Sequence, residues 1–210
     1  MICELLPACV ECEEVTGSPD PAPLTPEEAA TLGNAIEKRR REFALGRQCA
    51  RAALARLGIG PVTILPGPKR EPLWPAGVVG SITHCSGYCA AAAARQSDVP
   101  SLGIDAENYR PLESGVVERI TLPEERRWIA AQCAPEVRWD LLFFSAKESV
   151  YKAWFPLTGR WLGFEDVRIE IDLAGHGFTA QVAAGGPRVF HGRYALGERR
   201  VLTAALPGAR

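Results

Sequence analysis

The chain has 210 residues, 47% of them hydrophobic and 23% charged, and a formal net charge of −1. These values are those of an ordinary globular protein with one large domain or two small ones. A nearly neutral chain has no general attraction to nucleic acid or to an anionic membrane. Its longest apolar run, around Cys89 to Ala94, is also too short to span a bilayer. We therefore expect neither nucleic acid nor a membrane as a partner.

The first residues, MICELLPACVECEE, carry acids and no basic segment, which argues against a signal peptide and favours the cytoplasm. Cys9 and Cys12 form a CxxC pair with Cys3 nearby, but no second close pair with matching spacing follows. A structural zinc site normally needs four ligands. We therefore expect reduced thiols rather than a zinc site or a disulfide framework.

Residues 1–26 are acidic and proline-rich, and PDPAPLTPEE (19–28) is predicted to be a linker that runs into a helix. Thr25 and Glu28 have the spacing of a capping box, with a proline at the first helical position. The helical pattern continues to about Leu57, and we expect a break near Gly46.

Arginines follow the start of this helical stretch. Arg39 and Arg47 are eight residues apart, so they fall on roughly the same side of a helix. Guanidinium groups on one face suit a phosphate. A solvated helix face is the simpler alternative for the run as a whole.

A short strand is predicted at residues 62–65, and the proline-rich loop 66–75 follows it. The loop carries Lys69 and Arg70 beside Trp74. Two cations next to an aromatic plane suit a nucleotide, whereas an exposed turn with solvated charges is the alternative.

The stretch from Val78 to Ala94 is predicted to form a strand, a turn and a second strand. Ser81 and Thr83 alternate with an isoleucine, and His84 follows at the end of the first strand. An imidazole between two apolar strands needs a partner, such as a phosphate. A purely structural histidine is the alternative.

Residues 101–107, SLGIDAE, are predicted to form a strand with Asp105 and Glu107 on one face. Two neighbouring carboxylates raise each other's pKa unless a cation intervenes. Such a pair suggests a hard divalent metal, and a solvated strand end is the alternative.

The stretch 110–137 is predicted to be mostly helical, and 143–154 a core helix on which Glu148 and Lys152 lie one turn apart. An ordinary ion pair would explain these two residues taken alone. Strands are expected at 167–171 and 178–182, and two more within 189–206.

Three carboxylates with a lysine and several candidate phosphate binders suit a metal-assisted reaction at a pyrophosphate. Neither a Walker loop nor a GxGxxG motif occurs, which excludes a P-loop NTPase and a Rossmann enzyme. The order and spacing of five segments resemble the Sfp-type 4′-phosphopantetheinyl transferases, in particular the bacterial branch that is similar to enterobactin synthetase component D. These segments are REFALGRQCA (41–50), PKREPLWP (68–75), GSITH (80–84), GIDAE (103–107) and FSAKESVYKAW (144–154).

The resemblance implies an α+β fold with two similar lobes, each an antiparallel sheet with helices, related by a pseudo-twofold axis. It implies an N-terminal lobe at 1–100 that binds the phosphates and adenine of coenzyme A, and a C-terminal lobe at 101–210 with the metal and the catalytic residues. The ligand would lie between the lobes, and the protein would be a monomer.

The resemblance also implies site residues. The Mg²⁺ ligands (with Mn²⁺ as the alternative ion) would be Asp105, Glu107 and Glu148. The catalytic residues would be Glu148 and Lys152. Contacts to coenzyme A would come from Arg39, Arg47, Lys69, Arg70, Ser81, Thr83, His84, Asp105, Lys147 and Lys152.

The implied reaction transfers 4′-phosphopantetheine from coenzyme A to a serine of an acyl or peptidyl carrier protein. This would activate fatty-acid, polyketide or nonribosomal peptide synthases, including those that make siderophores. Glu148 is the candidate base, with a metal-bound water as the competing one, and Lys152 would stabilise charge on the pyrophosphate. Two alternatives are a metal-dependent nucleotide pyrophosphate hydrolase and a non-catalytic coenzyme A-binding module.

Overall fold

The protein consists of two compact units. The computed structural model describes residues 1–17, 19–113, 115–134 and 136–208. One unit comprises residues 7–100, and the other comprises 1–6 together with 101–210. We call them the N-terminal and C-terminal units. The first six residues therefore do not belong to the N-terminal lobe in which the sequence places them, because their 3₁₀ helix η1 (Ile2–Leu5) contacts strands β7 and β8.

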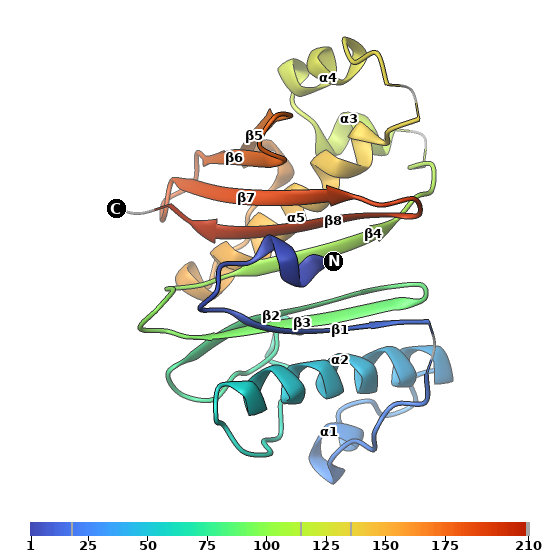
Figure 1. Ribbon diagram of the computed structural model, residues 1–210, viewed down its shortest axis with the longest axis vertical. Helices are drawn as coiled ribbons and strands as arrows, with labels where there is room; N and C mark the ends of the chain where they lie inside the picture. The colour runs from blue at the N-terminus through green and yellow to red at the C-terminus, as the bar shows by residue number, and fades with distance from the viewer. Residues whose placement is uncertain (18, 114, 135, 209–210) are drawn as a thin grey trace. The chain divides into compact units, whose positions relative to one another are not determined.

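The N-terminal unit is a three-stranded antiparallel sheet with the strand order β1-β3-β2. The long helix α2 lies along one face of this sheet (Figure 1). Its elements are β1 (Glu11–Thr16), α1 (Pro26–Ala30), α2 (Glu37–Arg56), β2 (Val78–Cys85) and β3 (Tyr88–Arg95).

Small residues let α2 approach the sheet closely. The alanines of β3 from Ala90 to Ala94 are all fully buried. A Cβ atom on Gly46 would lie 3.0 Å from the Ile82 side chain of β2. Gly46 therefore marks a close helix–sheet contact within a continuous helix, and the predicted break at this residue is wrong.

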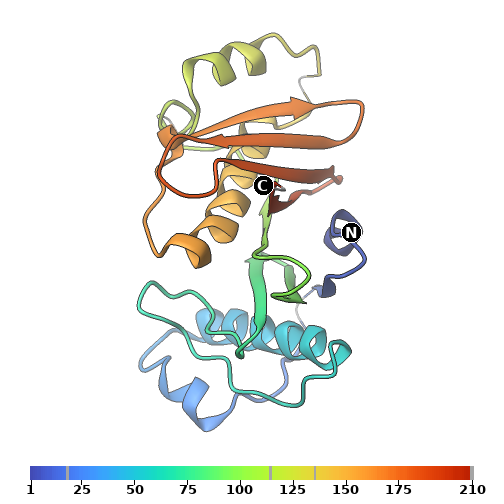
Figure 2. The same ribbon diagram turned by 90° about the vertical axis from the view of Figure 1, so that its left-hand side faces the viewer.

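The C-terminal unit is a five-stranded antiparallel sheet with the strand order β4-β8-β7-β6-β5. Helix α5 packs on one face of it, mainly against β4 and β8 (Figure 2). Its other elements are β4 (Gly103–Asn108), α3 (Val116–Ile120), α4 (Pro123–Ala130), α5 (Trp139–Thr158), the 3₁₀ helix η2 (Phe164–Asp166), β5 (Val167–Asp172), β6 (Gly177–Val182), β7 (Val189–Leu196) and β8 (Arg200–Pro207).

The two units share a chain path. In each, a first strand is followed by a helix of 20 residues and later by a hairpin whose last strand pairs with the first strand. The path is β1, α2, β2, β3 in one unit and β4, α5, β7, β8 in the other, where β5 and β6 extend the sheet. The predicted α+β fold built on two antiparallel sheets is confirmed.

Two local predictions are wrong, and one strand was not predicted. Residues 11–16 form strand β1 beside β3, where no element was expected. Residues 62–65 lie outside the helices and strands. Cys3 and Cys12 are disulfide-bonded, so the predicted reduced state is wrong for these two, whereas Cys9, Cys49, Cys85, Cys89 and Cys133 are outside any disulfide.

In the part of the chain that the structure describes, no helix is long and apolar enough to cross a membrane.

Gly103 at the start of β4 lies directly against the backbone of α5. A Cβ atom at this position would lie 1.9 Å from the Ser149 carbonyl oxygen and 2.7 Å from the Ala153 nitrogen. Both atoms belong to the helix backbone and cannot rotate away as a side chain can. Only glycine therefore allows β4 to lie directly against α5.

Gly103→Ala should lower the free energy of unfolding by about 3 kcal/mol, because an added methyl group forces two packed backbones apart. Urea denaturation measures the change. Gly60→Ala is the matched control, since nothing lies within 4 Å of a Cβ there, and it should leave stability unchanged or slightly higher. Equal stability of the two variants would contradict the packing described for Gly103.

Candidate active site

The acidic residues of β4 face helix α5. Residues two apart in a strand share a face, so Asp105 and Glu107 lie on the same side as Gly103, which touches the helix. Glu148 and Lys152 are one turn apart on α5. The glycine contact therefore brings the side chains of the two motifs into one region.

Asp105 has a partner for each carboxylate oxygen. Lys152 Nζ lies 2.7 Å from its Oδ1 and also donates to the Ile104 carbonyl at 3.1 Å. Ser145 Oγ donates to its Oδ2 at 2.8 Å. Thr203 of β8, which pairs with Asp105 in the sheet, donates to the Ser145 carbonyl at 2.9 Å. Asp105 is thus held in place by α5, with Thr203 supporting the contact.

The other two acids are shifted by burial and by their neighbours. Burial, together with Asp105 and Glu148, raises the pKa of Glu107 to about 7, and Arg110 and Lys152 act in the opposite direction. Burial and then Asp105 raise the pKa of Glu148, opposed by Lys152. Glu107 and Glu148 are therefore partly buried acids for which Asp105 is a nearby negative charge and Lys152 a nearby positive one.

A divalent metal fits this donor set chemically, because hard cations prefer carboxylate oxygens. As the side chains lie, however, the described residues contain no group of three His, Cys, Asp or Glu side chains that could hold a metal ion. Asp105 is paired with Lys152 instead. The predicted metal set of Asp105, Glu107 and Glu148 stays a prediction.

The N-terminal unit brings Arg39 and His84 together. Arg39 Nη1 lies 3.2 Å from His84 Nε2. The neighbouring Arg40 instead donates to two backbone carbonyls of the preceding segment, and Arg41 pairs with Asp20. Arg39 is thus the arginine of this run that reaches the histidine.

Arg47 lies two turns further along α2 and is buried, with 6% of its surface exposed. Burial lowers its pKa to about 10; Glu28 acts in the opposite direction, while Arg39 and Arg51 lower it further. The guanidinium group therefore stays charged at neutral pH. Arg39 and Arg47, predicted as phosphate binders, interact electrostatically.

Lys69 and Arg70 occupy an exposed turn. The Arg70 N–H donates to the Gly67 carbonyl at 2.9 Å, and the Lys69 N–H donates to Glu71 Oε2 at 2.8 Å. Arg70 has a φ of 69°, which is uncommon outside glycine. The tight turn leaves both cationic side chains facing solvent.

The polar residues of β2 lie on opposite faces. Ser81 and Thr83 are buried, each with 3% exposure, and alternate with Ile82, which packs in the core beneath α2. His84 follows on the Ile82 face and reaches Arg39. Ser81 and Thr83 therefore lie on the face of β2 opposite to His84.

Comparison with known proteins decides the family. Residues 27–94 match the 4′-phosphopantetheinyl transferase N-terminal domain, and residues 101–205 match the 4′-phosphopantetheinyl transferase superfamily. The chain belongs to this superfamily. The predicted family and the prediction of an enzyme are confirmed.

Several named relatives are similar to this transferase. It is 50% identical to the 4′-phosphopantetheinyl transferase Svp of Streptomyces mobaraensis over 97% of this chain and 88% of the relative. Identity to PptT of Mycobacterium tuberculosis (strain ATCC 25618 / H37Rv) is 44%, over 88% and 87% of the two chains. Identity to enterobactin synthase component D of Escherichia coli (strain K12) is 37%, over 59% of each chain.

Lys147 of the transferase, a predicted coenzyme A contact, is buried in an ion pair. Its Nζ lies 2.7 Å from Glu125 Oε2 and donates to the Phe164 carbonyl at 3.0 Å. Both side chains of the ion pair are 1% exposed. Glu125 also accepts the N–H of Ile169 at 2.8 Å and that of Leu122 at 2.7 Å. This arrangement ties α4, α5, η2 and β5 together and leaves the ammonium group no access to a ligand.

Two residues of the acidic region, Ser145 and Thr203, were not identified as site residues from the sequence of the transferase. Ser145 and Thr203 support Asp105, but nothing in the sequence indicates which residue of β8 stands opposite Asp105. The only available signal was the isolated threonine in the apolar strand VLTAAL.

Lys147→Met should lower the free energy of unfolding of the transferase by about 3 kcal/mol, because it leaves the buried Glu125 carboxylate without its cation. Chemical denaturation measures the loss, and Lys147→Met/Glu125→Gln should recover part of it. If Lys147→Met instead kept full stability and lost affinity for coenzyme A, Lys147 would be the ligand contact predicted from the sequence.

Proposed function

We propose that this transferase moves the 4′-phosphopantetheine group of coenzyme A onto a serine hydroxyl of an acyl or peptidyl carrier protein. Membership of the superfamily across both units supports the proposal. The observation that carries it is the meeting of Asp105 and Lys152 beside Glu107 and Glu148. These residues belong to the two most specific motifs of the chain.

The reaction forms a bond between the serine oxygen and the β-phosphorus of coenzyme A. The bond from that phosphorus to the bridging oxygen breaks, and 3′,5′-adenosine bisphosphate leaves with the electron pair. A serine hydroxyl is a poor nucleophile at neutral pH and needs a base to take its proton. Glu148 is the proposed base, because it lies near Asp105 and Lys152 on the face of α5 that meets β4.

Lys152 is proposed to stabilise the negative charge that develops on the pyrophosphate. Its ammonium group is oriented by Asp105 and by the Ile104 carbonyl. A cation oriented before the reaction lowers the barrier without a further reorganisation cost. About a quarter of its side-chain surface is exposed, which leaves one side accessible.

The proposed metal ligands are Asp105, Glu107 and Glu148. A bound Mg²⁺ would supply positive charge to the phosphate oxygens, and Mn²⁺ has the same preference for oxygen. Burial is the largest cause of the raised pKa values of Glu107 and Glu148, and the nearby carboxylates add to it. A bound cation would offset both effects, which supports the proposal.

The N-terminal unit is proposed to bind the phosphates and adenine of coenzyme A. Arg39, Arg47 and His84 would contact phosphate, and Lys69 with Arg70 would contact the adenine and the 3′-phosphate. Ser81 and Thr83 remain proposed contacts to coenzyme A, as do Asp105 and Lys152 of the C-terminal unit. Lys147 is left out because its ammonium group is buried against Glu125.

The proposed partners are carrier domains of fatty-acid, polyketide or nonribosomal peptide synthases, including siderophore synthases. The similarity to enterobactin synthase component D supports the last of these. We further propose a monomer in the cytoplasm, since one chain carries all the residues assigned to the reaction.

Intact mass spectrometry of an apo carrier protein, incubated with coenzyme A, Mg²⁺ and the transferase, tests the function. Transfer raises the mass of the carrier by one phosphopantetheine group. Release of adenosine bisphosphate without that gain would indicate a hydrolase, and neither change would indicate a binding module. Both of these outcomes contradict the proposal.

Glu148→Gln should lower the rate of transfer by about 10²- to 10⁴-fold, because the amide cannot take the serine proton, while coenzyme A still binds. The same mass assay, combined with calorimetry for coenzyme A, measures both effects. Glu170→Gln is the matched control, since Glu170 is an exposed acid on β5 that pairs with Arg168. Wild-type turnover in Glu148→Gln would disprove the assigned role.

A further inference from the structure

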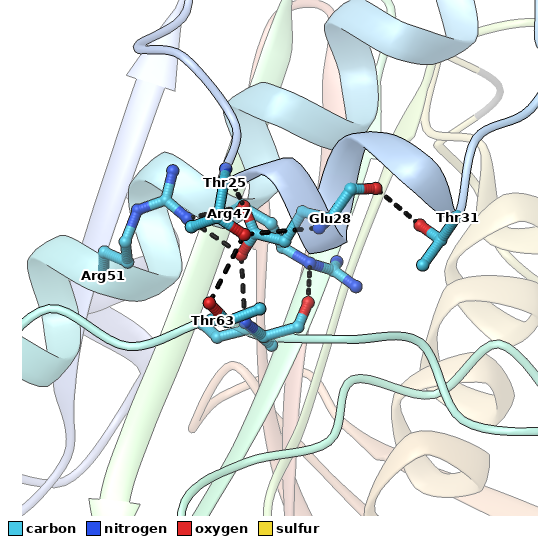
Figure 3. A network of polar contacts seen from close by, with 7 residues as sticks. Thr25, Glu28, Thr31, Arg47, Arg51 and Thr63 are labelled. Atoms are coloured by element: carbon cyan, nitrogen blue, oxygen red, sulfur yellow. Dashed lines mark hydrogen bonds and ion pairs between the residues drawn. The ribbon is translucent and has the colours of Figure 1, made fainter.

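The backbone N–H and the backbone carbonyl of Ile64 are each held by a charged side chain of the N-terminal unit. Its N–H donates to Glu28 Oε1 at 2.9 Å, and its carbonyl accepts a hydrogen bond from Arg47 Nε at 2.8 Å (Figure 3). Ile64 is fully buried and lies outside the helices and strands. Its backbone groups therefore depend on these side chains for hydrogen bonds.

Glu28 is a rigid acceptor at this point. It is fully buried near the start of α1, where it completes a capping box by accepting the Thr25 N–H at 3.1 Å. Arg51 Nη1 lies 2.9 Å from each of its carboxylate oxygens. Glu28 thus pairs with Arg51 from α2 and leaves Arg47 to other contacts.

The contacts of Arg47 orient its guanidinium group but use only one of its three nitrogens. Its guanidinium carbon lies 4.0 Å from the centroid of the Phe43 ring, and its Nε is taken by the Ile64 carbonyl. Its two terminal nitrogens donate to none of the residues that the structure describes. An arginine fork of fixed orientation is suited to a phosphate, which it can bind through two parallel hydrogen bonds.

We propose that Glu28 is a positioning residue for coenzyme A binding, which holds Arg47 in its phosphate-binding orientation through the backbone of Ile64. This inference rests on the proposed function, in which Arg47 contacts a phosphate of coenzyme A. Glu28 itself touches no substrate. Its effect passes through two hydrogen bonds, one to the N–H and one to the carbonyl of Ile64.

The competing explanation is that the Glu28–Arg51 pair merely holds α1 against α2. Three variants separate the two explanations. Glu28→Met removes the acceptor for Ile64 and leaves Arg51 without its partner. Glu28→Met/Arg51→Met also removes the acceptor but leaves no unpaired charge, so it should be the more stable of the two. Arg51→Lys keeps a cation beside Glu28 and keeps the contact to Ile64.

Steady-state kinetics with an apo carrier protein measures the outcome. Glu28→Met and the double variant should both raise KM for coenzyme A about tenfold, the usual scale for losing a hydrogen bond to a charged group. Their kcat and their KM for the carrier should stay within about twofold of the wild-type values, as should every constant of Arg51→Lys. A KM that follows thermal stability, with the double variant close to wild type, would overturn the positioning role.

A double-mutant cycle with Arg47→Met tests the route of the effect. Calorimetry should show that Glu28→Met weakens coenzyme A binding in the wild-type background and changes it less than about twofold once Arg47 is removed. Additive losses would overturn the inference and leave the function untouched. A wild-type protein that binds no coenzyme A, or an Arg47→Met variant that binds it normally, would instead refute the function proposed for Arg47.

Discussion

The contact between the backbone of β4 and the backbone of α5 at Gly103 is the constraint on which the acidic region depends. A Cβ atom added to this glycine would lie only 1.9 Å from the Ser149 carbonyl oxygen, so there is room for a hydrogen atom and nothing larger. Two residues further along the strand, Asp105 then falls within reach of both Ser145 and Lys152 on the helix. The glycine and the acids of the GIDAE motif thus act together. The glycine sets the distance between β4 and α5, and this distance lets the acids reach side chains of the helix.

Both units also use a buried glutamate in the same way. Glu28 and Glu125 each stand near the start of a short helix that begins with proline, and each accepts a backbone N–H of its own capping turn. Each accepts a second N–H from the segment that follows the long helix, and each pairs with a cation on that helix. Breaking such a pair is costly because a buried charge is left unpaired. In the C-terminal unit this cation is Lys147, which explains why a lysine of the catalytic motif is structural in this protein.

Much of the fold could be predicted from the sequence because hydrophobic period and capping are local properties. The hairpin of β2 and β3, the strand with Asp105 and the helix with Glu148 all follow from such patterns. Strand β1 could not be predicted from such a pattern, because its sequence ECEEVT is polar and the segment forms a strand by pairing with β3. The burial of Lys147 could not be predicted for a related reason. Its partner Glu125 lies 22 residues away, and no local pattern shows that the two side chains are buried together.

The proposed chemistry depends on Asp105, Glu107 and Glu148 forming one cation site beside Lys152. Electron paramagnetic resonance of Mn²⁺, titrated into the protein with coenzyme A present, tests it most directly. The account predicts one bound ion per chain, and an affinity that falls at least about tenfold in Glu107→Gln but not in Glu170→Gln. Absence of bound Mn²⁺, or binding that none of the three acids affects, would contradict the account at its centre.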